Sequence, residues 1–158
     1  MVGTIEKTCI VGCGDHGLEY MTGGRAVILG SVGKNFAAGM SGGIAWVLDE
    51  DGTLEARMNN GHAHAYPVSG EREGELRGLL EMHVQATGSR KAAEILENFP
   101  ERLKYFRMII SDEYLDYLKR AISDYPSLLI FDHNHWRDYT VENVTRLYLN
   151  ELKNLSIV

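Results

Sequence analysis

The spacing of apolar residues divides the chain into two parts with different periodicity. Runs such as Thr8–Val11 and Arg25–Leu29 are short and are followed by glycines, which is typical of buried strands. From about Glu71 onward, apolar residues recur every three or four positions, which is typical of amphipathic helices. The pattern therefore predicts strands in the first part of the chain and mainly helices in the second.

Helix start and stop signals set the expected bounds in the second part. Gly88 can end one helix, Ser89 can cap the next, and Pro100 bounds it. Ser111 can cap a third helix whose first turn is acidic, as the helix dipole prefers. Helices are expected over residues 75–86, 89–98, 112–122 and 140–155. Residues 105–110 are expected to form a strand or a buried turn, and residues 127–131 are a candidate strand. The last helix has an apolar face that we interpret as packed against its own domain, with a docking surface as the alternative. The face is formed by Val141, Val144, Leu147, Tyr148, Leu152 and Leu155.

The first part contains an internal repeat. The segment GDHGLEYMTGGRAVIL, which begins at Gly14, aligns with GKNFAAGMSGGIAWVL, which begins at Gly33, so the two copies are offset by 19. Residues 7–10 stand where AVIL would fall one period earlier. The aligned pairs include Met21 with Met40, Gly23-Gly24 with Gly42-Gly43, Ala26 with Ala45, Ile28 with Val47, and Leu29 with Leu48.

A period of this length with no helical half fits one coil of a parallel β-helix. At ~3.3 Å per extended residue, such a coil is a path of roughly 60 Å, enough for two or three short strands. Glycines would recur at its corners because they take positive φ without a steric clash. The predicted fold is therefore α+β, with a short right-handed parallel β-helix at the N-terminus and an α-helical C-terminal part. A Gly-rich antiparallel sandwich is the alternative.

Glycine content sets the expected domain organisation. Of the 17 glycines, 13 lie in residues 1–61, and no proline precedes Pro67. We expect Gly-rich coils over residues 1–57, a connector over 58–74 and a mainly helical part over 75–158.

The glycines Gly12, Gly14 and Gly17 also match the dinucleotide-binding fingerprint GxGxxG. That fingerprint needs a helix that opens at the third glycine and an acidic residue roughly 20 positions further on. Only five residues separate Gly17 from Gly23, and no Asp or Glu occurs between Glu19 and Asp49. A dinucleotide-dependent oxidoreductase is therefore the least favoured function, and we assign these glycines to coil corners.

Composition narrows the setting and the partners. A net charge of -6 argues against non-specific binding to nucleic acid or to an anionic membrane. No apolar run approaches the ~20 residues of a membrane span, and no secretory signal is visible. Two cysteines cannot form a disulfide framework, so a reducing, cytoplasmic location is expected.

Two groups of histidines are candidates for metal binding. His62 and His64 lie in the expected connector, and Asp132, His133 and His135 follow an expected strand. Alternating positions on a strand place two imidazoles on one face, which zinc could use. A closed zinc site needs four ligands, and the sequence shows no complete set, so surface or capping roles are favoured.

Other reactive side chains occur in the Gly-rich part. His16 and Glu19 could form an acid–base pair, but no nearby nucleophile completes a site, so bonding to the neighbouring backbone is favoured. Cys9 and Cys13 could be redox-active, although Cys9 lies in an apolar run where thiols usually serve as small buried hydrophobes. We therefore expect no catalytic, cofactor-binding or metal-binding residue in this chain.

The repeat carries a family resemblance. VGCGDHGLEYMTGGRAVILG followed by GKNFAAGMSGGIAWVLDEDG resembles the C-terminal GXGXG domain of the glutamate synthase large subunit. The resemblance continues more weakly through LLEMHVQATGSRKAAEIL and FRMIISDEY, which look like the terminal helices and last strand of that subunit. It covers roughly residues 8–119 and is strongest before residue 52.

The resemblance implies a part of an enzyme and not its activity. The complete large subunit is an FMN and iron–sulfur enzyme that transfers ammonia from glutamine to 2-oxoglutarate and makes glutamate. Its GXGXG domain is a β-helix with an architectural role and no assigned catalytic residues. The glutaminase domain, the flavin barrel, the cluster cysteines and the earlier coils have no counterpart here, and residues 124–158 match nothing in the family.

A non-catalytic structural or assembly domain, or a split subunit, is therefore the expected function. A free-standing β-helix protein with its own small-molecule or metal-binding role is the alternative. Repeat proteins need about three units for stability, and only two full coils are visible. The open end of the stack would expose unpaired backbone groups. We expect other domains or subunits of a glutamate synthase-like enzyme, a second copy of the chain, or the helical tail to cover it.

Overall fold

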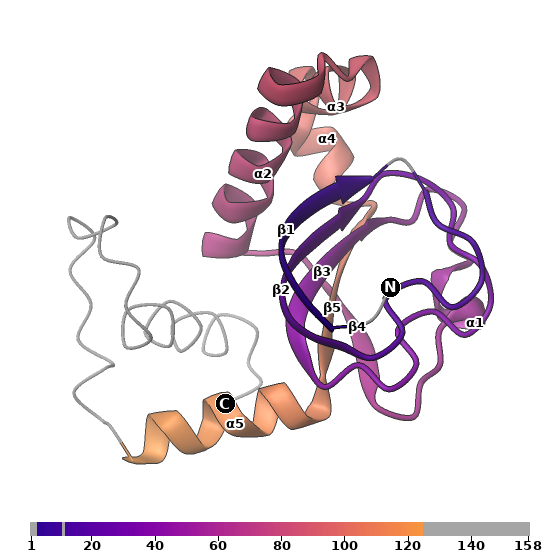
Figure 1. The fold of residues 1–158 in the computed structure, drawn as a ribbon. Helices are drawn as coiled ribbons and strands as arrows, with labels where there is room; N and C mark the ends of the chain where they lie inside the picture. Colours follow the sequence, from indigo (N-terminus) through magenta and orange to yellow (C-terminus); the bar gives the residue numbers. More distant parts are fainter. Residues whose placement is uncertain (1–2, 11, 125–158) are drawn as a thin grey trace.

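The computed structural model describes residues 3–10 and 12–124, which form one mixed sheet with helices, an α/β fold (Figure 1). Three parallel strands are followed across the sheet by two antiparallel ones, in the order β1-β2-β3-β5-β4. The strands are β1 (Gly3–Ile10), β2 (Met21–Ile28), β3 (Gly42–Leu48), β4 (Ala63–Pro67) and β5 (Phe106–Ser111). The helices are α1 (Leu54–Arg57), α2 (Glu71–Thr87), α3 (Arg90–Glu97), α4 (Phe99–Leu103) and α5 (Asp112–Asp124).

The predicted parallel β-helix, and with it the α+β class, is wrong. Each repeat contributes one strand to a single sheet, whereas a β-helix needs two or three strands in every coil. The rest of each repeat, residues 15–20 and 35–39, is folded into turns except at Phe36, which makes an isolated bridge with Met58. Beyond β3 the neighbouring strand is antiparallel β5, which ends the parallel stack. The antiparallel sandwich is excluded as well, because β1, β2 and β3 are parallel.

The register of β2 and β3 confirms the internal repeat. Ala26 pairs with Ala45 and Ile28 with Val47, as the offset of the repeat predicts. In β1 the offset is shorter by one position, because Ile10 pairs with Ile28. A shift of one position moves a side chain to the opposite face of a sheet, so this correction decides which residues of β1 face the helices.

The turns of the two repeats stack directly on each other. Residues 14–20 form one turn segment and residues 33–39 form the other, and the backbone of each bonds to that of its neighbour. The bonds run from His16 N–H to Lys34 O (2.8 Å), from Tyr20 N–H to Ala38 O (2.9 Å), from Ala37 N–H to Gly17 O (2.9 Å) and from Gly33 N–H to Gly14 O (3.2 Å). Repetition in sequence therefore becomes repetition in backbone pairing outside the sheet as well as within it.

Both turn segments use left-handed backbone at the same repeat positions. The pairs with their φ angles are His16 (63°) with Asn35 (54°), Leu18 (57°) with Ala37 (60°), and Tyr20 (54°) with Gly39 (63°). Five of these six residues carry a side chain, for which this conformation costs roughly 1–2 kcal/mol each. The stacking bonds and the buried side chains below hold the strained turns in place.

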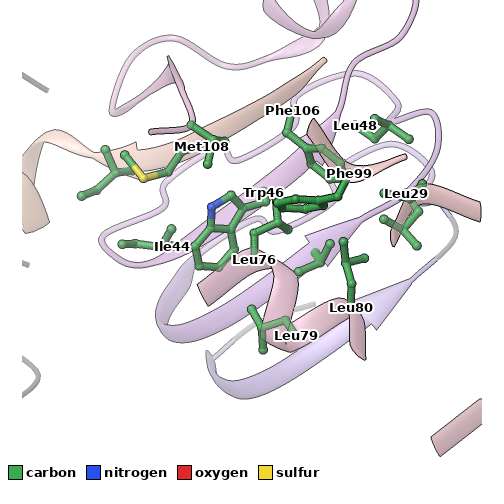
Figure 2. Packing of buried hydrophobic residues seen from close by; sticks show 14 of the residues in the cluster. Leu29, Ile44, Trp46, Leu48, Leu76, Leu79, Leu80, Phe99, Phe106 and Met108 are labelled. Atoms are coloured by element: carbon green, nitrogen blue, oxygen red, sulfur yellow. The ribbon is translucent and has the colours of Figure 1, made fainter. Parts of the chain in front are cut away.

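The sheet has two buried faces. Even-numbered residues of β3 and β5, such as Trp46 and Met108, lie under the helices with Leu76, Leu79 and Ile95 (Figure 2). Alternate residues of the same strands face the turn segments, because successive side chains of a strand point to opposite faces. This second cluster comprises Leu18, Met21, Ala26, Ile28, Val32, Phe36, Ala37, Met40, Ala45, Val47, Leu54, Met58, Ala63 and Ile109.

The helical layer largely follows the sequence prediction. α2 ends at left-handed Gly88, whose N–H bonds to Val84 O (2.8 Å), and the Ser89 hydroxyl caps α3 by accepting from Ala92 N–H (3.3 Å). Ser111 likewise accepts from Tyr114 N–H at the start of α5 (3.2 Å). For residues 105–110 a strand or a buried turn was predicted, and the strand is the one observed, as β5.

Three features of the fold depart from the predicted layout. α1 and α4 were not predicted, and Pro100, taken as a stop, is the second residue of α4, where its missing N–H costs nothing. The stretch 58–74, predicted as a connector, contains β4 and the start of α2. The strand predicted over 127–131 and the helix predicted after Thr140 lie outside the described residues.

Candidate functional site

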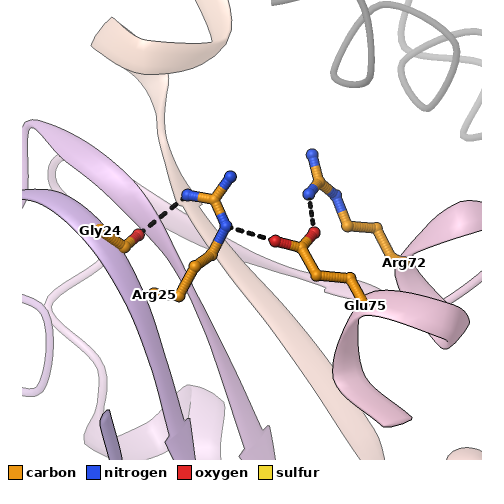
Figure 3. A network of polar contacts seen from close by, with 4 residues as sticks. All are labelled: Gly24, Arg25, Arg72 and Glu75. Atoms are coloured by element: carbon orange, nitrogen blue, oxygen red, sulfur yellow. Dashed lines mark hydrogen bonds and ion pairs between the residues drawn. The ribbon is translucent and has the colours of Figure 1, made fainter. Parts of the chain in front are cut away.

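Four polar side chains meet between the sheet and the helical layer. Arg25 on β2 points toward α2, where Arg72 and Glu75 lie one turn apart on the same helix face (Figure 3). Arg25 Nε donates to Glu75 Oε1 at 2.6 Å, and its Nη1 donates to Gly24 O at 2.9 Å. Arg72 donates to the other oxygen of Glu75. The carboxylate therefore joins α2 to β2 through two guanidinium groups.

The electrostatics of this cluster favour the ionised form of the Glu75 carboxyl. Burial raises the pKa of the Glu75 carboxyl, but the charges and hydrogen bonds of Arg72 and Arg25 outweigh it and leave the pKa below its usual range. Burial also raises the pKa of Tyr114, the fourth member of the cluster, which lies on α5. A carboxylate held ionised by two arginines is a poor proton donor and a poor nucleophile. The cluster therefore acts as a clamp between elements.

His16 and Glu19 do come together, at 3.5 Å between Nδ1 and Oε1. Both lie on the outer turn segment, and the His16 side chain is 54% exposed. Exposed ion pairs of this kind contribute about 0–1 kcal/mol. The backbone N–H of His16 bonds to Lys34 O, and the N–H of Glu19 bonds to His16 O, so both residues also take part in the turn bonding.

The two histidines of the former connector lie at the junction of β4 and α5. His64 Nε2 is 3.2 Å from Asp112 Oδ2, and His62 O accepts from the Asp112 N–H at 2.8 Å. Within residues 3–10 and 12–124, no group of three or more His, Cys, Asp or Glu side chains could hold a metal ion. Asp132, His133 and His135 lie outside the described residues.

Both cysteines are unpaired and partly buried. Burial raises the pKa of the Cys9 thiol to about 11. Burial likewise raises the pKa of Cys13, although a backbone hydrogen bond from Gly33 acts in the opposite direction. The thiolate is the reactive form, so both thiols are weak nucleophiles at neutral pH.

Gly17, the third glycine of the fingerprint, serves packing. Gly17 leads into turns and then into β2, so the helix N-terminus that a pyrophosphate needs is missing from this position. A Cβ on Gly17 would lie 2.5 Å from Cys13 Sγ and 3.1 Å from the Phe36 ring. The third glycine is therefore required for the close approach of neighbouring turns.

Sequence reasoning missed a polar groove of about 780 Å³ between α3, α4 and the turn after β3. In this groove Arg102 Nη2 donates to Glu50 Oε1 at 2.5 Å. No motif could have revealed the groove, because its residues come from separate elements. Its charges largely cancel, and its lining residues are Glu50, Arg90, Lys91, Glu94, Ile95, Asn98 and Arg102.

The open side of β1 is the candidate site with the clearest geometry. β1 is the terminal strand of the sheet and pairs only with β2 among the described residues. The turn segment 14–20 lies at the same end of the stack. Backbone groups of an edge strand can pair with another polypeptide, so this end is a candidate interface and not a reaction centre.

Comparison with known proteins identifies the class. Residues 4–112 match the family model of the GXGXG motif. Over 112 residues the chain is 47% identical to "Glutamate synthase [NADH]" of Schizosaccharomyces pombe, a match that covers 70% of this chain. It is 45% identical over 107 residues to "Glutamate synthase [NADPH] large chain" of Bacillus subtilis, covering 66% of this chain. It is 43% identical over 108 residues to "Ferredoxin-dependent glutamate synthase 2, chloroplastic" of Arabidopsis thaliana, covering 68% of this chain.

The chain therefore belongs to the GXGXG motif family, and its residues 4–112 are a GXGXG domain of the glutamate synthase type. This confirms the resemblance seen in the repeat. The matched regions make up 5% of the Schizosaccharomyces pombe relative and 7% of the other two. Among the described residues, no helix has the length and apolar character needed to cross a membrane.

Proposed function

We propose that this chain is a non-catalytic structural domain, or a split subunit, of a glutamate synthase-like enzyme. The observation that carries the proposal is the match to a small part of much longer glutamate synthases, together with a sheet edge at one end of the matched region that is unpaired among the described residues. In this role the chain supports other domains that carry out the reaction. The complete enzyme would form glutamate from glutamine and 2-oxoglutarate.

The chemistry of the described residues supports a non-catalytic role. Glu75 is held as a carboxylate by two arginines, and the thiols of Cys9 and Cys13 have raised pKa values. His16 and His64 are exposed and pair with single carboxylates. None of these arrangements supplies an activated nucleophile or a general base beside a cavity.

The cofactors of the complete enzyme do not fit this chain. An iron–sulfur cluster is held by about four cysteine thiolates, whereas the sequence contains two cysteines, Cys9 and Cys13. The glycine fingerprint lacks the following helix that would bind a flavin phosphate. We therefore place FMN and the cluster on other domains or subunits. Two free thiols fit the reducing cytoplasm that we propose as the location.

A complementation experiment tests this function. The region that matches residues 4–112 is deleted from the Bacillus subtilis large chain, and this chain is supplied as a separate polypeptide. We expect the two to co-elute in size-exclusion chromatography and to recover glutamate formation, while this chain alone forms none. An equal concentration of an unrelated protein is the control. Glutamate formation by the chain alone would contradict the non-catalytic role, and failure of both co-elution and recovery would contradict the assembly role.

A further inference from the structure

The outer side of α5 carries a pair of aromatic side chains that extends the core under the helices to the surface. Leu115 and Leu118 on this helix are buried in that core. Tyr114 is partly buried and packs against the same cluster, whereas Tyr117 is 51% exposed. The two tyrosine rings are stacked, with centroids 6.2 Å apart and planes 6° from parallel. An apolar side chain placed on Tyr117 would therefore join the core.

The two tyrosines form a strip along α5. Side chains three positions apart share one face of a helix, and Tyr114 and Tyr117 have this spacing. α5 begins directly after β5, contacts β5 and β3, and runs away from the strands (Figure 1). Apolar anchors at three- and four-residue spacing are the pattern by which one helix packs along another. The strip, called here the tyrosine face of α5, therefore fits a second helix.

Two other large hydrophobic side chains are exposed in the described ranges, and neither belongs to such a strip. Tyr20 lies in a turn, where its ring already packs on Gly39, since a Cβ on Gly39 would lie 2.5 Å from Tyr20 Cε1. Met82 on α2 is followed one turn later by the exposed polar residue Gln85. The tyrosine face of α5 is therefore the surface where added apolar groups would extend existing packing.

The chain itself contains a segment of the required chemistry. Residues 140–155 have apolar residues at helical spacing, so the sequence predicts a helix with one apolar face. The connecting residues 125–139 can span about 50 Å when extended, whereas α5 is about 20 Å long. The segment can therefore reach the tyrosine face in either direction. Its apolar face consists of Val141, Val144, Leu147, Tyr148, Leu152 and Leu155.

Both the tyrosine face and this segment lie beyond the region shared with the family. The family model matches residues 4–112, and residue 112 is the first of α5. Packing of one apolar face on the other removes apolar surface of both from water. We propose that residues 140–155 form a helix whose apolar face packs on the tyrosine face of α5 in the same molecule. This inference goes beyond the proposed function, because it concerns residues that the family match does not include.

NMR contacts in the full chain test this packing. We expect nuclear Overhauser effects between the ring protons of Tyr117 and methyl groups of residues 140–155. They should keep their relative intensity when the labelled chain is mixed with an excess of unlabelled chain, because both groups belong to one molecule. Weakening on mixing would assign the tyrosine face to a second copy and overturn the inference. Contacts of residues 140–155 with α2 or β1 and none with Tyr117 would overturn it as well.

Leu152→Asp gives a second test with a matched control. Leu152 belongs to the apolar face, whereas Asn150 lies on the opposite side of the predicted helix. We expect Leu152→Asp to speed amide exchange of Lys119 and Arg120 on α5 by about tenfold, which corresponds to ~1.4 kcal/mol of lost packing. Asn150→Asp adds the same charge and should change these rates by less than about twofold. Equal effects of the two substitutions would contradict the packing.

A double substitution tests whether the two faces act on each other. In a chain that already carries Tyr117→Ala, Leu152→Asp should have little further effect on amide exchange in α5, because the contact is already lost. Tyr117→Ala itself should leave the amide signals of β2 and β3 in place, since the Tyr117 side chain is largely exposed. Fully additive effects of Tyr117→Ala and Leu152→Asp would show that the segment packs on another surface, and the inference would then be wrong.

Discussion

At the scale of single residues, glycine at equivalent repeat positions can have different packing roles. Gly14 and Gly33 are aligned in sequence, yet only Gly33 lies against the backbone of a preceding turn. The difference depends on position in the stack and not on local conformation, since neither residue has a positive φ. Substitution of each should therefore separate the packing role from the conformational role of glycine.

We expect Gly33→Ala to lower the free energy of unfolding by roughly 1–3 kcal/mol, because the new Cβ would overlap Asp15 N and the turns would have to separate. Gly14→Ala should change it by less than about 0.5 kcal/mol in this chain. Urea denaturation followed by circular dichroism measures both. Equal effects of the two substitutions would contradict the stacking of the turn segments.

The thiol of Cys9 gives a second prediction at this scale. With a pKa of about 11, it is almost wholly protonated at pH 7.5 and becomes a thiolate only as the pH rises toward that value. Alkylation by iodoacetamide at pH 7.5 should be more than about tenfold slower than that of an exposed cysteine in a peptide, followed by mass spectrometry. In urea the difference should disappear. Rapid alkylation of the folded protein would show that the thiol is reactive.

At the scale of elements, ion pairing fixes how the helical layer meets the sheet. Glu75 pairs with both Arg25 and Arg72, so its replacement removes a carboxylate that two guanidinium groups share. By contrast, Arg77 and Glu81 form an exposed pair at 3.1 Å on the same helix. The two pairs allow the energetic effect of burial to be measured within α2.

Glu75→Gln should lower the free energy of unfolding by about 2–4 kcal/mol at pH 7, somewhat less than for a fully buried pair because the Glu75 side chain is 30% exposed. The control, Glu81→Gln, should cost about 0.3–0.5 kcal/mol. Since folding lowers the pKa of Glu75, its contribution is present above the usual value of 4.5 and is lost as the pH falls below it. The difference in stability between the unmodified chain and Glu75→Gln should therefore become smaller below pH 4.5. A constant difference down to pH 2 would show that the charge of Glu75 is not the cause.

Most elements could be predicted from local signals. Ser89, Gly88 and Ser111 mark helix ends in sequence and in structure alike, because capping is determined by neighbouring residues. β4 could not be predicted, since it becomes a strand only through its pairing with β5, and α2, α3 and α4 separate these two strands along the chain. The clamp between Arg25 and Glu75 also joins residues far apart in the sequence and was missed for the same reason.

At the scale of the whole molecule, the repeat indicated a stack but not how the stack ends. A repeat of this length is compatible with a closed coil of several strands or with one strand and a turn. The choice depends on the left-handed turn positions. Five of these six positions carry residues other than glycine, so no glycine marked them in the sequence: His16, Leu18, Tyr20, Asn35 and Ala37. The open edge was anticipated from the number of repeats, whereas its identity as the outer side of β1 follows from the strand order of the sheet.

One sheet shared by two buried clusters should make the described part of the molecule unfold as a unit. Leu80 lies in the cluster under the helices and Met40 in the cluster under the turns, both at most 1% exposed, and adjacent residues of β3 and β5 belong to opposite clusters. Loss of packing on one face therefore loosens strands that also support the other face. Such coupling is typical of a single cooperative domain.

We expect Leu80→Ala to lower the free energy of unfolding by about 2–4 kcal/mol. Amide exchange of Phe36 and Ala37, which lie on the opposite face, should become faster by the factor that corresponds to this loss of free energy. Met40→Ala should have a similar effect on amides of α2. Met82→Ala is the control, because Met82 is 46% exposed and its truncation should change little. The measurement is native-state hydrogen exchange with thermal melting at 222 nm. If Leu80→Ala speeds exchange only in the helices and leaves Phe36 and Ala37 unchanged, the two layers unfold separately, and the turn stack is stable without its helical cover.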